Sequence, residues 1–246
     1  MTNTAIIGGT GLTRLEGLEI TKRKPVVTLY GEPSAPLTYG MLNGKEVVFL
    51  PRHGAGHTLP PHKINYRANI QALKDTGISR IIAIAAVGGI AENFPPMTLA
   101  IPDQIIDYTW SRKSTFFEDG LKEVTHIDFT YPYDERLRQL LIQACKKTNV
   151  NFCDYGTYGA TQGPRLETAA EINKYERDGC TMVGMTGMPE AALARELGIA
   201  YATCAVSVNW AAGRSDTPIT MEEIEKCLKD GMYTINDMFE KLVPLL

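Results

Sequence analysis

Ile81-Ile82-Ala83-Ile84-Ala85-Ala86-Val87-Gly88-Gly89 is a continuous apolar run that ends in two glycines. A strand has a continuous apolar sequence when helices cover both faces of its sheet, because the side chains on each face then pack against an apolar layer. Before and after this run, other apolar and β-branched runs alternate with helical patterns. The sequence therefore predicts an α/β protein with a covered central sheet.

Nine runs in all are predicted as strands. They are Thr4–Ile7, Val26–Tyr30, Leu37–Leu42, Glu46–Leu50, Ile81–Ala86, Leu99–Tyr108, Cys153–Thr161, Met182–Met185 and Ile199–Val208. Asn43-Gly44 joins two of them and is a strong signal for a tight hairpin, so that pair is expected to be antiparallel and the sheet mixed. The sheet is also expected to be twisted.

Helical periodicity is clearest in three segments: Asp134–Thr148, Pro189–Leu197, where proline stands at a plausible first helical position, and Thr220–Leu242. No repeat, low-complexity tract or linker divides the chain. We therefore expect one α/β domain over residues 1–246, with a mixed, twisted sheet flanked by helices.

Composition excludes several classes of protein. The chain has 246 residues, of which 44% are hydrophobic, and its 25 basic and 28 acidic side chains give a net charge of -3. No global cationic field exists for nucleic acid or anionic lipid, so neither is an expected partner. No run approaches the roughly 18 apolar residues of a membrane span, and no basic leader precedes the first strand. The five cysteines form no CxxC pair, which favours a reducing, cytoplasmic location and buried thiols.

Glycine-rich or polar segments follow several of the predicted strands. Gly8-Gly9-Thr10-Gly11 follows the first; its glycines let backbone N–H groups approach an anion, although a tight turn alone also needs glycine. Pro51–Thr58 contains Arg52 and His53, which supply donors at a strand end. His53, His57 and His62 could in principle ligate a metal, but their glycine- and proline-containing segment is not a helix that would align positions i and i+4, and it lacks a nearby carboxylate, so no metal site is predicted. A solvated histidine-rich loop is the alternative.

Two further polar segments lie later in the chain. Glu167 follows Gly163-Pro164-Arg165-Leu166 and is either an ordinary first-turn acid of a helix or a functional carboxylate. Asn209 stands where an apolar run stops, so it either begins a turn or presents its amide to a ligand. Among all these segments the recurring feature is hydrogen-bond donors, namely Thr10, Arg52, His53 and Thr186, which suit a small tetrahedral oxyanion.

Taken together and in order, the motifs resemble the trimeric purine nucleoside phosphorylase and methylthioadenosine phosphorylase family. The resemblance includes IIGGTGL from Ile6, PRHGAGHT from Pro51, HKINYRANIQAL from His62, AAVGGI, ATQGPRLET, MTGMPEAALARELG and AVSVNW. It implies a distorted, barrel-like mixed sheet, a homotrimer, and reversible phosphorolysis of an N-glycosidic bond with inorganic phosphate as co-substrate and no cofactor.

The resemblance also implies residue roles. The phosphate site is expected at Thr10, Arg52, His53, the backbone of Ala85 and Ala86, and Thr186. Asn209 is the expected catalytic group at N7 and O6 of the leaving purine, His53 is a second catalytic candidate, and Met185 is expected to pack on the nucleoside. His126 resembles a residue that a neighbouring subunit contributes to the pocket.

Three positions bear on the substrate. The methylthioadenosine enzymes carry Asp-x-Asp where this chain has Asn209-Trp210-Ala211, and Glu167 resembles the glutamate of the 6-oxopurine enzymes. A carboxylate accepts from the N1–H of hypoxanthine but meets a lone pair on adenine, and such sites discriminate by about 10⁴ or more. Met221 aligns where the inosine enzymes have a histidine for the 5′-hydroxyl, so an S-methyl group is expected there; a core position in the helix is the alternative for Met221.

The joint occurrence of Glu167, Asn209 and Met221 predicts phosphorolysis of S-methyl-5′-thioinosine to hypoxanthine and 5-methylthioribose 1-phosphate. Within the class, a general inosine/guanosine phosphorylase and a methylthioadenosine phosphorylase remain alternatives. From other classes, a nucleoside-binding protein without turnover is disfavoured because the phosphate donors are present in the sequence. A nicotinamide-dependent oxidoreductase is disfavoured because GxGxxG is incomplete.

Overall fold

The computed structural model describes residues 3–9, 12 and 15–246 of the chain. In this part of the chain, strands and helices alternate as the sequence predicts. The strands are β1 (Thr4–Gly8), β2 (Glu19–Lys24), β3 (Leu37–Leu42), β4 (Lys45–Pro51), β5 (Arg80–Gly89), β6 (Leu99–Ala100), β7 (Gln104–Asp107), β8 (Phe152–Cys153), β9 (Thr157–Ala160), β10 (Met182–Gly184) and β11 (Ala200–Trp210). The α-helices are α1 (Tyr66–Asp75), α2 (Glu135–Cys145), α3 (Ala169–Arg177), α4 (Gly187–Glu196) and α5 (Met221–Leu242).

All of these strands belong to one mixed sheet. Its main path runs β2-β3-β4-β1-β5-β10-β9-β7, and β11 pairs with β5 and continues to β6 and β8. The β3–β4 pair is the antiparallel hairpin expected at Asn43-Gly44. The predicted mixed sheet is therefore confirmed, and within the described residues its two ends, β2 and β7, do not pair with each other.

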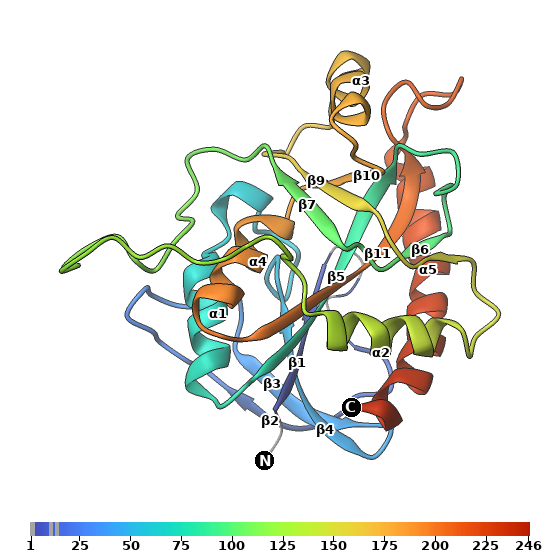
Figure 1. Ribbon diagram of the computed structural model, residues 1–246. Coiled ribbons are helices and arrows are strands. Elements are labelled where there is room, and N and C mark those ends of the chain that lie inside the picture. The colour runs from blue at the N-terminus through green and yellow to red at the C-terminus, as the bar shows by residue number, and fades with distance from the viewer. Residues whose placement is uncertain (1–2, 10–11, 13–14) are drawn as a thin grey trace.

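Helices cover the sheet from two sides (Figure 1). One apolar cluster joins α1 and α4 to the strands, through residues such as Ile70, Leu73 and Leu193. A second cluster joins α2 and α5 to the sheet through Leu141, Ile235 and Met238. Helices α2 and α5 both show the 3.6-residue apolar pattern that predicts them, and each begins at a capping side chain, Asp134 or Thr220.

Strand β5 organises the sheet because its pairing changes along its length. β1 pairs with the first part of β5, as far as Ala83, and β10 pairs with its end, at Gly88 and Gly89. On the opposite edge, β11 follows β5 from Arg80 to Gly89. Residues 84–87 of β5 are thus paired with β11 on one edge, while β1 and β10 separate on the other.

Some predicted strands are wrong in position or extent. Val26–Tyr30 forms only an isolated bridge between Thr28 and Gly31: Val26 packs against the core, but Val27 and Leu29 are 74% and 97% exposed. Instead β2 forms at Glu19–Lys24, a fully exposed edge strand rich in charge, as edge strands often are. The predicted Leu99–Tyr108 strand is divided at Pro102, which cannot donate to a ladder, and the predicted Cys153–Thr161 strand is divided around Gly156.

The structure can be compared with two expectations from the sequence: that the cysteine thiols are buried and that no segment spans a membrane. All five cysteines are free thiols; Cys145, Cys180 and Cys204 are buried, whereas Cys153 and Cys227 are only partly buried. Across the described ranges, none of the helices has the length and apolar character that crossing a membrane would require.

Candidate active site

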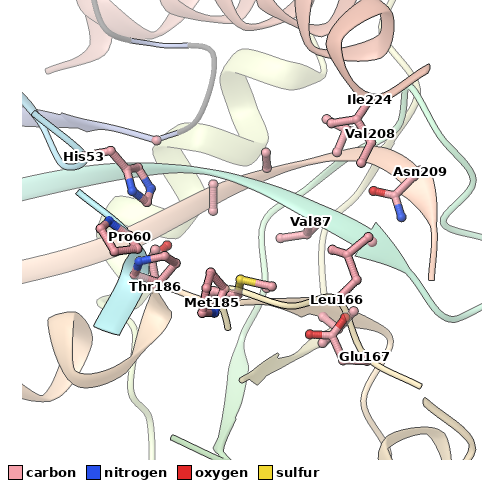
Figure 2. Close-up of a pocket in the computed structure, with 18 of the residues that line it drawn as sticks. His53, Pro60, Val87, Leu166, Glu167, Met185, Thr186, Val208, Asn209 and Ile224 are labelled. Carbon is pink, nitrogen blue, oxygen red and sulfur yellow. The ribbon is translucent and has the colours of Figure 1, made fainter. Parts of the chain in front are cut away.

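A cavity of about 600 Å³ opens where β1 and β10 separate along β5. Its walls come from the ends of several strands, which is where ligands bind in open α/β sheets. In Figure 2, His53, Pro60 and Thr186 lie at one end, Leu166, Glu167 and Asn209 lie at the other, and Met185 and Val87 lie between them. We call the first group the donor end and the second the base end.

The donor end is built on a buried ion pair. Arg52, at the end of β4, is 1% exposed, and Glu190 of α4 is 0% exposed. The guanidinium donates from Nε to Glu190 Oε2 at 2.6 Å and from Nη2 to Glu190 Oε1 at 2.7 Å. Tyr201 also donates to Oε1 at 2.9 Å. Burial opposes the charge on Arg52, but Glu190 more than offsets it, so the pKa of Arg52 is raised above its ordinary value.

The open edge of β5 supplies backbone groups to the same end. Arg52 Nη1 donates to the carbonyl of Ile84 at 3.0 Å. Because alternate residues of a strand present their backbone groups to the same edge, Ala86 faces this edge as well. Gly9 is needed here: a Cβ on it would lie 2.6 Å from the Ile84 carbonyl oxygen. Among the described residues, the ion pair and this bond use three of the five guanidinium N–H groups, and the other two have no protein partner there and can face an anion.

His53 is held in one tautomer. Its Nδ1 lies 2.8 Å from the carbonyl oxygen of Leu59, which can only accept, so Nδ1 carries the proton. Burial, with help from the positive charge of Arg52, lowers the pKa of His53 to about 4. At neutral pH the ring is therefore uncharged and its Nε2 is an acceptor, not the donor that the sequence interpretation assumed. A phosphate that retains one proton matches this acceptor.

Thr186 and Met185 lie on the turn between β10 and α4. Thr186 is 7% exposed and lines the donor end; Met185 lines the middle of the cavity. Arg112 holds this turn from the other side, donating to the carbonyls of Met185 at 2.8 Å and Met188 at 2.7 Å. The same guanidinium donates to the carbonyl of Gln162 at 2.8 Å and so ties the turn to the segment that leads to Glu167.

Glu167 is a half-buried carboxylate at the base end. Thr161, the residue after β9, donates from Oγ1 to Glu167 Oε1 at 2.6 Å. Burial raises the pKa of Glu167, and the bond from Thr161 partly opposes that effect. One carboxylate oxygen is thus held by the protein, while the group as a whole lines the cavity.

Asn209 and Ala211 form the opposite wall of the base end. The Asn209 amide donates from Nδ2 to the carbonyl of Trp210 at 2.7 Å, which leaves its other N–H and its Oδ1 for a ligand. The Trp210 side chain is not among the groups that line the cavity, so this residue contributes through its backbone.

A third, apolar side is made by the start of α5. Met221, Ile224 and Ile219 line the cavity there, together with His57. Met221 is 64% exposed, so it is a wall residue and not the core residue that was the alternative. The apolar wall continues into a surface groove that shares Met221, Ile224 and His57.

The structure thus gathers most of the predicted site residues around one cavity: Arg52, His53, Ala85, Ala86, Thr186, Glu167, Met185, Asn209, Ala211 and Met221. Thr10 lies outside the described residues. His126 does not line the cavity; it lies on the irregular segment between β7 and α2, which projects from the body in Figure 1. Within the described ranges, no three His, Cys, Asp or Glu side chains are grouped as they would be to hold a metal ion.

Sequence reasoning did not assign roles to Glu190, Arg112 or Thr161. Glu190 was detectable as the one charge inside the apolar stretch Met188–Leu193. Thr161 was part of a quoted motif but had no distinguishing feature. Arg112 belongs to a segment without helix or strand, and no local pattern connects it to the two turns that it holds.

Residues 3–244 match the phosphorylase superfamily, and the chain belongs to that family of enzymes. It is 57% identical over 232 residues to a probable S-methyl-5′-thioinosine phosphorylase of Pseudomonas syringae pv. tomato, with 94% of each chain covered. It is 43% identical to a 6-oxopurine nucleoside phosphorylase of Pyrococcus furiosus, covering 100% of this chain and 94% of the relative. Among solved structures, methylthioadenosine phosphorylase of Schistosoma mansoni in complex with adenine superposes with a TM-score of 0.94 at 30% identity, covering 100% and 92% of the two chains.

Proposed function

We propose that the protein catalyses the reversible phosphorolysis of S-methyl-5′-thioinosine, giving hypoxanthine and 5-methylthioribose 1-phosphate. The observation that carries this proposal is the placement of the Glu167 carboxylate and the Asn209 amide at one end of a cavity whose other sides are donor-rich and apolar. The ionised carboxylate accepts from the N1–H of a 6-oxopurine, whereas adenine presents a lone pair there. The S-methyl group packs against Met221 and Ile224.

Phosphate is the co-substrate at the donor end, and no resident cofactor is required. The two remaining N–H groups of Arg52, the hydroxyl of Thr186 and the edge of β5 at Ala86 bind its oxygens, with Thr10 as a further ligand. His53 Nε2 accepts a hydrogen bond from the O–H group of a phosphate that retains one proton. Holding the nucleophile in line with the anomeric carbon is an orientation effect that can reach roughly 7–11 kcal/mol.

Bond cleavage places negative charge on the departing base. A phosphate oxygen forms a bond to C1′ as the bond from C1′ to N9 breaks, and the electron pair of that bond passes to the purine. The free N–H of Asn209 stabilises this charge at N7 and O6, and Oδ1 accepts from N7 once solvent has protonated it. One well-placed donor of this kind is worth about 3–4 kcal/mol. Met185 packs against the nucleoside between the two ends.

The relatives support the base assignment. The protein of Pseudomonas syringae is named as a probable S-methyl-5′-thioinosine phosphorylase, and that of Pyrococcus furiosus as a 6-oxopurine nucleoside phosphorylase. Both names specify a 6-oxopurine. An aspartate pair of the kind expected in methylthioadenosine enzymes is absent at residues 209–211.

A general inosine phosphorylase is the second candidate. The observation in its favour is His57, which lies beside Met221 and Ile224 on the apolar side and offers a polar group to a 5′-hydroxyl. The two functions differ only at this side of the cavity.

We further propose that the enzyme works as a homotrimer in the cytoplasm. The segment between β7 and α2 includes His126 and carries exposed apolar side chains, among them Trp110 at 66%, Val124 at 73% and Tyr131 at 71%. An interface would cover them and bring His126 to a neighbouring pocket. Five free thiols suit a reducing compartment.

A substrate panel tests the proposal. We expect kcat/KM to be highest for S-methyl-5′-thioinosine, lower for inosine and guanosine, and lowest for methylthioadenosine. Higher kcat/KM for methylthioadenosine than for S-methyl-5′-thioinosine would contradict the assignment of the base end. Equal values for inosine and S-methyl-5′-thioinosine would favour the second candidate.

A further inference from the structure

We propose that Thr161 is a positioning residue that sets the base selectivity of the enzyme by orienting Glu167 and keeping it ionised. The inference rests on the proposed function, in which Glu167 reads the N1 edge of the purine. Thr161 itself does not line the cavity and acts only through the carboxylate.

The hydroxyl of Thr161 is fixed in space by its own backbone. Its N–H donates to the carbonyl of Gly184 at 2.7 Å, and its carbonyl accepts from Arg112 Nη2 at 3.1 Å. The residue is 5% exposed, so water does not compete for the hydroxyl. A donor held in this way selects one orientation of the Glu167 carboxylate, with Oε1 bound and Oε2 left for the purine.

The hydroxyl also distinguishes the two protonation states of Glu167. It has one proton and two acceptors within reach, Glu167 Oε1 at 2.6 Å and the Gly184 carbonyl at 3.3 Å. When Glu167 is ionised, the proton goes to the carboxylate in a short, charge-assisted bond. When Glu167 is neutral, the hydroxyl can donate only a weaker, uncharged bond to the acid, or it turns to Gly184 while the acid O–H donates to Thr161 Oγ1. Thr161 therefore favours the ionised form.

The other charged groups around Glu167 do not replace this bond. Glu171, on the first turn of α3, raises the pKa of Glu167, and Arg165 lowers it. The Arg165 guanidinium is itself paired with Glu171, at 2.7 and 2.8 Å, and is 68% exposed. Tyr175 of α3 also interacts electrostatically with Glu167, and it is uncharged at neutral pH. Burial is already the largest influence on Glu167, and a backbone hydrogen bond of Glu167 is the next one after Thr161 that opposes it, so loss of the Thr161 hydroxyl would raise the pKa of Glu167 further and increase the share of the neutral acid.

A neutral Glu167 reads the base differently. Its O–H group can donate to the N1 lone pair of adenine, and it no longer offers a negatively charged acceptor to the N1–H of hypoxanthine. The ratio of kcat/KM for S-methyl-5′-thioinosine to kcat/KM for methylthioadenosine is accordingly the measure of what Thr161 does.

The experiment compares Thr161→Val, which removes the hydroxyl at nearly constant shape, with the matched control Thr161→Ser, which keeps it. We expect Thr161→Val to lower the selectivity ratio at pH 7.5 by roughly 10-fold or more, and to shift the acidic limb of kcat/KM for S-methyl-5′-thioinosine to higher pH. We expect Thr161→Ser to leave both quantities close to those of the natural protein. Thr161→Ala takes the place of the valine variant if that one does not fold.

Glu167→Gln, alone and combined with Thr161→Val, completes the cycle. If Thr161 acts through Glu167, the valine substitution has no further effect on selectivity once residue 167 cannot ionise. An equal loss in both backgrounds, or an unchanged acidic limb in Thr161→Val, would overturn the inference while leaving the proposed function intact. If Glu167→Gln alone leaves the selectivity ratio unchanged, the assignment of Glu167 to the base fails, and the proposed function fails with it.

Discussion

Replacing Glu190 by glutamine tests the buried ion pair on which the donor end is built. Arg52 and Glu190 are 1% and 0% exposed and share two hydrogen bonds, and Tyr201 contributes a third to the same carboxylate. In the glutamine variant one carboxylate oxygen becomes an NH₂ group that faces donors, and the Arg52 charge stays buried without its partner. Breaking a buried pair from one side costs about 3–5 kcal/mol.

The free energy of unfolding from urea titration measures this loss. For a chain of this size each kcal/mol corresponds to about 2–4 °C in Tm, so Tm should fall by roughly 6–20 °C. Because bound phosphate brings negative charge next to Arg52, we also expect added phosphate to restore part of the lost stability, as any ligand that binds the folded state does.

Glu171→Gln is the matched control. It makes the same chemical change in a two-bond pair with Arg165, which is 68% exposed, and glutamine preserves the capping box of α3. Exposed pairs contribute about 0–1 kcal/mol. If Glu190→Gln costs no more than this control, the buried pair does not stabilise the fold in the way argued here.

Three other substitutions test the remaining parts of the site. His53→Asn keeps a donor for the Leu59 carbonyl but does not titrate. In the natural protein the pKa of His53 falls from 6.5 to about 4 on folding, so the contribution of the neutral ring to the free energy of unfolding is complete above pH 6.5 and up to about 3 kcal/mol is lost as pH falls toward 4. Urea titrations of both proteins between pH 7 and 4.5 should show a smaller loss of this free energy in the variant. Parallel curves for the two proteins would refute the assignment of His53. Asn209→Asp with Ala211→Asp should shift relative kcat/KM toward 6-aminopurine nucleosides by roughly 10- to 100-fold, as one or two changed hydrogen bonds imply; no shift would mean that these residues do not contact the base. Met221→His should lower kcat/KM for S-methyl-5′-thioinosine by about 4-fold, the value of one buried methyl group, and raise it for inosine; unchanged ratios would place the 5′ end elsewhere.

Local pattern was sufficient to predict most of the fold. The apolar run from Ile81, the Asn43-Gly44 hairpin and the helices beginning near Asp134 and Pro189 all follow from side-chain period and turn chemistry. Pattern failed at Val26–Tyr30, where Val26 packs on the core but Val27 and Leu29 are exposed and the segment forms only one isolated bridge. It also failed at Glu19–Lys24, because an exposed edge strand needs no apolar face.

Sequence reasoning likewise identified some residues of the candidate site and assigned no role to others. Arg52 and Asn209 were identified because each is a polar residue at the end of an apolar run, and Glu167 because it follows the Gly163-Pro164-Arg165-Leu166 corner between a strand and a helix. Glu190, Thr161 and Arg112 were assigned no role, because what matters about each is a contact with another residue. Glu190 binds Arg52, 138 positions away; Thr161 binds Glu167, 6 positions away; and Arg112 binds the carbonyl of Met185, 73 positions away. The tautomer of His53 depends on one carbonyl, and sequence alone suggested the opposite hydrogen-bonding role.

The break in pairing along β5 explains why polar groups collect at this place. A sheet in which β1 and β10 joined would satisfy the edge of residues 84–87 with backbone bonds and leave no room for a ligand. In the separated sheet, the Ile84 carbonyl needs another donor, and Arg52 is that donor. A buried guanidinium in turn needs a carboxylate, which Glu190 supplies at the start of α4. The opening that admits a substrate and the ion pair that stabilises the fold around it are thus two consequences of one change in strand pairing.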